Sequence, residues 1–151
     1  MPGSFFDTNV LVYLASRDAV KAERAEATIS AGGTISVQVL NELANVCRRK
    51  MDLSWSGTRT FLSTLGELLA VSPISVETHD DALALAERYE LSVYDAMIAA
   101  SALQAGCDTL WSEDLQDGMT IERKLRVINP FTNRSPEQRA KTPRPARSRR
   151  S

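Results

Sequence analysis

Apolar residues along the chain form short dense runs that alternate with longer stretches of helical spacing. Five runs are rich in β-branched or aromatic residues and predict short strands at Ser4–Phe6, Thr34–Val37, Val71–Val76, Asp108–Trp111 and Leu125–Ile128. Apolar positions three or four residues apart predict helices at Val10–Leu14, Asp18–Ser30, Val39–Met51, Ser54–Ala70, Thr78 or His79 to Tyr89, and Ser92–Gly106. Strands that alternate with helices indicate an α/β domain with a central sheet of four or five mainly parallel strands.

The length and composition of the chain suit one folded domain followed by a tail. It has 151 residues, of which 43% are hydrophobic, enough to bury a core. After Phe131 the apolar periodicity gives way to Arg, Pro, Ser and Thr, so we expect a domain at residues 1–133 and a disordered tail at residues 134–151. No apolar run approaches the ~18 residues of a membrane span, and the start lacks the features of a secretory signal. We therefore expect a cytoplasmic protein without a membrane segment.

The charge is distributed unevenly along the chain. The net charge is −1, but from Arg134 onward seven basic residues stand against Glu137 alone, so this segment carries +6 and the remainder −7. Two interpretations of the tail stay open: it attracts RNA without reading bases, or it only keeps the chain soluble. Cys47 and Cys107 lack the spacing of a metal site or a disulfide framework. The single histidine, His79, excludes a mechanism based on paired histidines.

Two acidic residues stand at positions where a carboxylate needs an explanation. Asp7 follows the first predicted strand and precedes a helix, so it suits both a helix N-cap and a ligand at the carboxyl end of a strand. Glu42 lies three residues after Val39 and four before Val46, on the flank of an apolar stripe. A carboxylate in such a place is costly unless it reaches water, is paired or binds a metal ion.

Asp95 has two interpretations. It stands three residues after Ser92 in a pattern close to a capping box, which favours a role at the start of a helix. It also shares a helical face with apolar residues, and this places it toward the interior: Ile98, Ala99 and Ala102.

The segment after Trp111 supplies three further acids, Glu113, Asp114 and Asp117, and the sequence pattern does not choose among them. Together, the acids fall at the ends of two strands and on the inward flanks of two helices. Carboxylates gathered in one place repel one another unless a cation neutralises them, and hard divalent ions such as Mg²⁺ prefer oxygen ligands. The pattern therefore predicts a metal site without an organic cofactor.

The segments around these acids resemble the motifs of PIN-domain ribonucleases. The first three matches are Phe5–Leu11, Ser36–Glu42 and Tyr94–Ala100, and Trp111–Leu115 is similar to the segment that carries the last acid. The resemblance runs from Ser4 to Phe131. In its size and in the residues of the second motif, the chain is most similar to the VapC branch, the toxins of type II toxin–antitoxin systems.

This resemblance implies a PIN-like three-layer α/β/α fold with a metal-dependent active site. It assigns Asp7, Glu42, Asp95 and Asp114 as catalytic residues that bind one or two Mg²⁺ or Mn²⁺ ions, with supporting polar residues at Thr8, Asn9 and Ser112. The fourth motif leaves Glu113 and Asp117 in competition with Asp114. The basic tail is not part of the family pattern.

The implied activity is hydrolysis of RNA phosphodiester bonds by water that a metal ion activates, leaving 5′-phosphate and 3′-hydroxyl ends. The VapC resemblance further implies a small antitoxin protein as partner and a homodimer. Two alternatives stay open: a PIN-type nuclease that processes RNA without an antitoxin, and a non-catalytic nucleic-acid-binding module. A phosphatase or dehalogenase with Asp7 as nucleophile fits poorly, because Asn9 stands where such enzymes carry a second acid.

Overall fold

The computed structural model describes residues 3–132. The strands are β1 (Ser4–Phe6), β2 (Thr34–Ser36), β3 (Ala70–Ser72), β4 (Thr109–Trp111), β5 (Thr120–Ile121) and β6 (Leu125–Ile128). The helices are α1 (Thr8–Val12), the 3₁₀ turn η1 (Tyr13–Ala15), α2 (Ala19–Ile29), α3 (Val37–Arg49), α4 (Trp55–Leu68), α5 (Val76–Tyr89) and α6 (Val93–Gln104). The predicted boundary at residue 133 and the tail at residues 134–151 lie outside the described residues.

The strands form a single sheet in the order β3-β2-β1-β4-β6-β5. Every neighbouring pair is parallel except the edge pair β5 and β6. In the centre, Phe5 stands opposite Leu110, and the Asp7 N–H donates to the Trp111 carbonyl at 2.9 Å. The segments that follow β1 and β4 therefore begin side by side at one edge of the sheet, where ligand sites of open α/β sheets are found.

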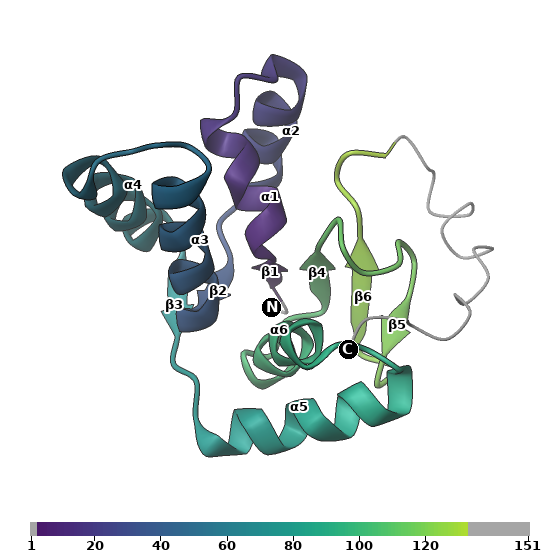
Figure 1. Ribbon diagram of the computed structural model, residues 1–151. Helices are drawn as coiled ribbons and strands as arrows, with labels where there is room; N and C mark the ends of the chain where they lie inside the picture. Colours follow the sequence, from purple (N-terminus) through teal and green to yellow (C-terminus); the bar gives the residue numbers. More distant parts are fainter. Residues whose placement is uncertain (1–2, 133–151) are drawn as a thin grey trace.

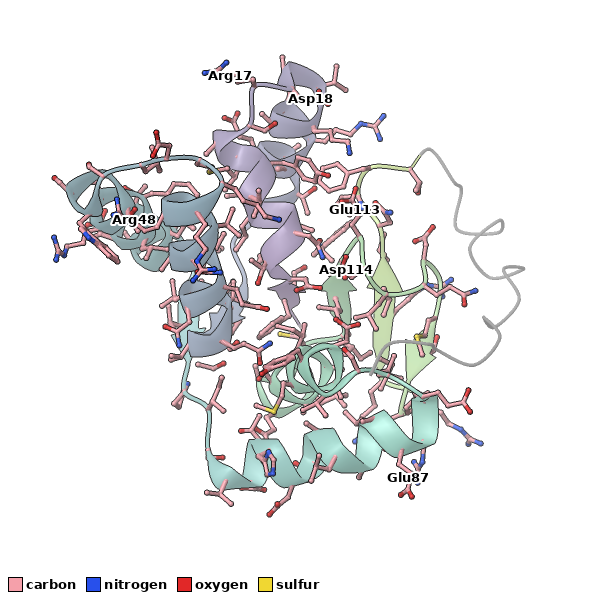
Figure 2. All side chains as sticks on the ribbon, viewed as in Figure 1. Arg17, Asp18, Arg48, Glu87, Glu113 and Asp114 are labelled. Carbon is pink, nitrogen blue, oxygen red and sulfur yellow. The ribbon has the colours of Figure 1, made fainter. Side chains whose placement is uncertain are left out.

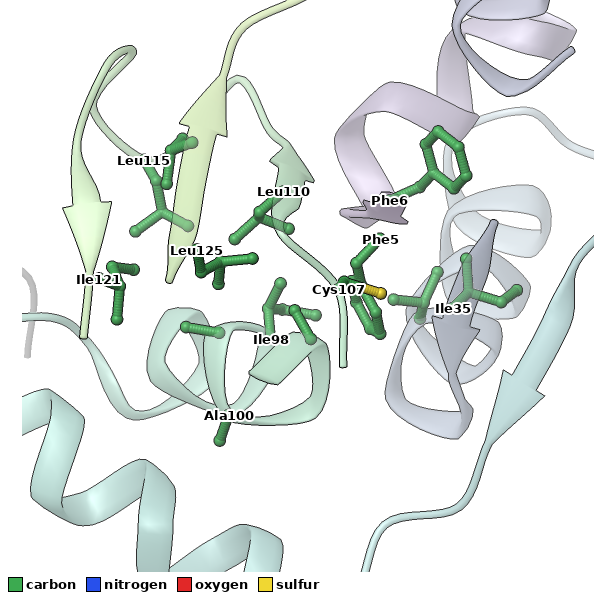
Figure 3. Close-up of a cluster of buried hydrophobic side chains, with 14 of the residues drawn as sticks. Phe5, Phe6, Ile35, Ile98, Ala100, Cys107, Leu110, Leu115, Ile121 and Leu125 are labelled. Carbon is green, nitrogen blue, oxygen red and sulfur yellow. The ribbon is translucent and has the colours of Figure 1, made fainter. Parts of the chain in front are cut away.

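Helices flank the sheet on both sides (Figure 1). Helix α6 packs against the sheet and α5 packs on α6, while α1 to α4 lie together on the side of the molecule away from α5. Between the strands and α6, fully buried side chains such as Phe5, Leu110 and Ile98 form the core (Figure 3). No helix of the described residues is long and apolar enough to cross a membrane. The predicted α/β architecture with a mainly parallel sheet is confirmed.

Several element boundaries differ from the prediction by a few residues, and three of the differences are informative. Helix α5 begins at Val76 and not at Thr78 or His79, because Ser75 is the N-cap and Thr78 supplies the reciprocal hydroxyl of a capping box. The third strand is correspondingly short and ends at Ser72. Val37, predicted as the end of the second strand, is the first residue of α3.

The sheet has six strands where four or five were predicted. The additional strand is the short edge strand β5, which no pattern in the sequence predicted. It is two residues long and pairs with β6 through a turn in which Glu122 and Arg123 adopt φ angles of 53° and 58°. Such turns usually contain asparagine or glycine, which adopt positive φ at little cost. Since neither residue type marks this turn, no local pattern predicted a hairpin here.

Candidate active site

Asp7 lies at the centre of the acidic residues, immediately after β1. Its side chain is 4% exposed and accepts three hydrogen bonds: from the Thr8 N–H at 2.8 Å, the Ser112 hydroxyl at 2.7 Å and the Asn9 amide at 3.1 Å. Asp7 is also the N-cap of α1. Both interpretations of Asp7 from the sequence are thus compatible with one position, since a capping carboxylate at this edge of the sheet still belongs to the acidic site.

Burial raises the pKa of Asp7 from 3.8 to about 7. The hydrogen bonds from Ser112 and Thr8 oppose this shift, while the negative charges of Asp114 and Asp95 add to it. The last two contributions are informative, because like charges act on a pKa only when they lie close to the group. Asp7, Asp95 and Asp114 therefore share one electrostatic environment, although they are far apart in the sequence.

The raised pKa of Asp7 predicts how the stability of the metal-free protein depends on pH. The folded protein holds this proton more tightly than the unfolded chain does. The contribution of Asp7 to the free energy of unfolding should therefore be highest below pH 4, fall by about 4 kcal/mol as the pH rises to 7, and change little above pH 7. Urea unfolding of chelator-treated protein across this range measures the slope, and Asp7→Asn is the control that should flatten it. Parallel profiles for the two proteins would contradict the prediction.

Glu42 lies on α3, which packs against α1. Its carboxylate accepts a hydrogen bond from the Thr8 hydroxyl at 2.7 Å, and its side chain is half-buried. Because Thr8 directly follows Asp7, this bond ties Glu42 to the segment that carries the central acid. On the same helix Val39 and Leu43 are buried, as their spacing predicted.

Asp95 lies in the first turn of α6. Ser92 is the N-cap and accepts a hydrogen bond from the Asp95 N–H at 3.1 Å, so Asp95 does not itself cap the helix. Its side chain is half-buried, while Ile98, Ala99 and Ala102 on the same helix are buried. Asp95 thus stands at the margin of the core, near enough to Asp7 to raise the pKa of that residue.

The three acids after β4 have different surroundings. Glu113 accepts a hydrogen bond from the Tyr13 hydroxyl at 2.8 Å, and its other oxygen lies 3.6 Å from the Lys21 ammonium. Asp117 is 7% exposed and accepts from the Asn129 N–H at 2.9 Å.

Asp114 is exposed, and of the three it is the one whose charge raises the pKa of Asp7. In Figure 2 it lies nearer to the strands than Glu113 does. These surroundings distinguish Asp114 from Glu113 and Asp117, which the sequence could not do.

The acids match a hard divalent ion in their chemistry, since their carboxylate oxygens are the donors that such ions prefer. Burial raises the pKa of Asp7 and the charges of Asp114 and Asp95 raise it further, so a nearby cation would favour the ionised carboxylate. In the part of the chain that the structure describes, however, no three His, Cys, Asp or Glu side chains stand close enough to hold an ion as they are. The residues thus fit a metal ion by donor type and charge, and their side chains have to draw together around it.

The sequence did not indicate the surroundings of two polar residues near the acids: Asn9, which the family resemblance marked as a supporting residue, and Ser36. The Asn9 side chain donates to Asp7 and accepts from the Glu113 N–H at 3.0 Å, so it bridges β1 to the loop after β4. Ser36 ends β2, the strand beside β1, and its hydroxyl is fully buried with no hydrogen-bond partner among the described residues. A lone serine at the end of a strand is common, and only the packed structure shows that its hydroxyl is left without a partner.

The family model described as PIN domain matches residues 4–116, most of the described chain. No curated protein sequence matches the chain.

Three solved structures show the same fold at low sequence identity. A toxin–antitoxin complex from Klebsiella pneumoniae is 22% identical, with a TM-score of 0.66 and coverage of 85% of this chain and 98% of that one. VapC20 from Mycobacterium tuberculosis, described as a sarcin–ricin-loop-cleaving toxin, is 17% identical, with a TM-score of 0.57 and coverage of 74% and 89%. DNA-bound VapBC from Salmonella typhimurium is 18% identical, with a TM-score of 0.56 and coverage of 84% and 97%.

Proposed function

The chain belongs to the PIN domain family, and from this premise we propose that it is a divalent-metal-dependent endoribonuclease that acts as the toxin of a toxin–antitoxin pair. The observation that carries the proposal is Asp7, a buried carboxylate whose pKa is raised to about 7 beside the charges of Asp95 and Asp114. A carboxylate with this pKa is only partly ionised at neutral pH, and the positive charge of a divalent ion would favour its ionised form.

The proposed ligands of Mg²⁺ or Mn²⁺ are Asp7, Glu42, Asp95 and Asp114. When bound, the ion supplies positive charge that activates water and offsets the charge that builds up on the phosphate. The chain's own hydrogen bonds orient two of these carboxylates. The Ser112 hydroxyl and the Asn9 amide fix Asp7, and the Thr8 hydroxyl fixes Glu42.

The proposed partners are an RNA substrate, a small antitoxin and a second copy of the chain in a homodimer. The support for a toxin comes from the fold shared with solved structures of toxins or toxin–antitoxin complexes. An antitoxin arginine or lysine placed among the carboxylates would neutralise them in place of the metal ion. We propose that the protein acts in the cytoplasm, where its RNA substrate is found.

Purified full-length protein tests the nuclease assignment directly. Incubation with cellular RNA in Mg²⁺ or Mn²⁺ should give fragments with 5′-phosphate ends, and excess chelator should abolish their formation. Sequencing of the 5′ ends after induction in cells would identify the cleaved RNA. Cleavage that persists in chelator would contradict the metal-dependent mechanism, and growth that is unaffected by expression without an antitoxin would contradict the toxin assignment.

The contrasting surroundings of Asp114 and Asp117 predict opposite effects of the same substitution. Asp114→Asn should lower the cleavage rate about 100-fold or more and leave stability almost unchanged, because its side chain is exposed. Asp117→Asn should leave cleavage largely intact and cost about 1 kcal/mol of unfolding free energy, because a neutral amide oxygen accepts from the Asn129 N–H more weakly than the carboxylate does. Initial cleavage rates and urea unfolding curves measure both effects. The reverse pattern would assign the fourth acid to Asp117.

A further inference from the structure

Cations gather where α3 meets α4, on a chain whose first 133 residues carry a net charge of −7. Residues 45–62 contain one acid, Asp52, and four basic residues: Arg48, Arg49, Lys50 and Arg59. Arg48 is half-buried and the other three cations are exposed. The sign of the surface charge is therefore reversed locally, and such a surface attracts phosphate groups.

Trp55, the first residue of α4, lies against one of these cations, Arg48. Its side chain is 58% exposed, an unusual state for a tryptophan. The Arg48 guanidinium lies 4.2 Å from the centre of its ring and also donates to the Leu53 carbonyl at 2.6 Å. Arg59 follows Trp55 by one helical turn and so lies on the same side of α4. We call Arg48, Arg49, Lys50, Trp55 and Arg59 the Trp55 patch; Figure 2 labels Arg48.

A purely structural role accounts for only part of the Trp55 patch. The stack of Arg48 on Trp55 fastens the connection between α3 and α4, and it is worth about 0.5–1 kcal/mol at an exposed site. This role requires one cation. It explains neither the three exposed cations nor a tryptophan that stays more than half exposed.

Helix α3 connects the Trp55 patch to the acidic site. Asn45 and Arg49 follow Glu42 by three and seven residues, which places all three on one side of the helix. Both Asn45 and Arg49 are exposed. Seven residues of α-helix span about 10 Å, so a polar surface leads from the acids to the cations over a short distance.

We propose that the Trp55 patch is a subsite for a single-stranded segment of the RNA substrate next to the phosphate that is cleaved. Trp55 stacks on a base, and Arg49, Lys50 and Arg59 contact phosphates. Aromatic rings flanked by cations bind single strands in this way, because every base offers a stacking face and every nucleotide a charge. The inference rests on the proposed ribonuclease function and extends it to the binding of the substrate.

Binding is tested with full-length protein made inactive by Asp95→Asn and a labelled, unstructured oligoribonucleotide. Fluorescence anisotropy across a salt series should show that Trp55→Ala weakens binding about 5- to 100-fold, while Trp55→Phe retains most of the affinity. Arg59→Ala should reduce the slope of log K against log salt by about 0.7, the value for one phosphate contact. Lys124→Ala, at an exposed cation in the β5–β6 turn, is the matched control and should change neither quantity.

Cleavage kinetics separate this subsite from the catalytic site. With the acids intact, Trp55→Ala should raise KM by a similar factor and change kcat less than threefold. Unchanged affinity and KM would overturn the subsite, and an equal loss of binding to a fully paired duplex would overturn the stacking of Trp55. A change in self-association by sedimentation, with RNA binding intact, would assign the patch to an interface between copies instead. If the unaltered protein does not cleave RNA with any divalent ion, it is the proposed function that fails.

Discussion

Asp7→Asn is expected to lower the rate of RNA cleavage by at least about 10³-fold, while the metal-free protein becomes more stable at pH 8. The rate falls because an amide is neutral and cannot hold a divalent ion as a carboxylate does. The stability rises by about 2–4 kcal/mol because the variant no longer buries a charge whose pKa is raised to about 7. The gain is smaller than the whole shift, since the Asn9 amide loses an acceptor.

Asp117→Asn is the matched comparison, because it makes the same chemical change at another buried aspartate. It should show the opposite signs: cleavage retained and stability reduced. Single-turnover cleavage at pH 8 measures the rate, and chemical unfolding at pH 8 measures the free energy of unfolding, each with and without Mn²⁺. An Asp7→Asn variant that cleaves RNA at the normal rate would remove Asp7 from the proposed site. If the Asp7→Asn variant is less stable without metal, the hydrogen bonds of Asp7 contribute more to stability than its buried charge costs.

Gly33→Ala is expected to destabilise the fold by about 3–5 kcal/mol, enough to lower Tm by roughly 10 °C or more. Gly33 has a φ of 153°, and a Cβ atom there would lie 2.5 Å from Phe6 Cε2 and 2.6 Å from the Ser4 carbonyl oxygen. Neither neighbour can easily move, since Phe6 is fully buried and Ser4 belongs to β1. The Gly33 carbonyl also accepts from the Ala70 N–H at 2.9 Å, so a shift would disturb a contact near the start of β3.

Two other glycines separate the causes of this effect. Gly32 has a φ of 81° but nothing within 4 Å of a Cβ, so Gly32→Ala should cost only about 1 kcal/mol from backbone strain. Gly66 lies inside α4 with open space around it, so Gly66→Ala should stabilise the protein by about 0.5–1 kcal/mol. Thermal unfolding should therefore give the highest Tm for Gly66→Ala, an intermediate Tm for Gly32→Ala and the lowest Tm for Gly33→Ala. Equal losses at Gly32 and Gly33 would show that the close approach of Phe6 is unimportant.

Much of the fold could be predicted because each element has its own periodic pattern. The run at Ser4–Phe6 and the spacing in α3 are local signals, and the structure confirms both elements. The turn at Glu122 and Arg123 had no local signal, because its positive φ angles are imposed by the pairing of β5 with β6. Sequence patterns report what a segment prefers, and they miss what its neighbours force on it.

At the candidate site, too, local sequence patterns could not predict which of the acids after β4 lies near Asp7. Glu113 and Asp117 are distinguished from Asp114 by Tyr13, Lys21 and Asn129, of which the first two lie about a hundred residues earlier in the chain. No local pattern carries that information. Assignment of the four acids as metal ligands stays a prediction, which the variants above test.

The contacts of Glu113 and Asp117 also have a consequence for the residue between them. Both neighbours hold the loop at fixed points, and the Ser112 hydroxyl accepts from the Asp114 N–H at 3.2 Å. The backbone around Asp114 has therefore already lost its conformational entropy during folding, at a cost of about 1–2 kcal/mol per residue. A flexible loop would instead incur this cost each time it bound a ligand. If Asp114 binds a cation as proposed, its side chain is the part of this loop that remains to be ordered. On the proposed function, the backbone of this loop would be preorganised for a metal ion while the Asp114 carboxylate is still exposed to solvent.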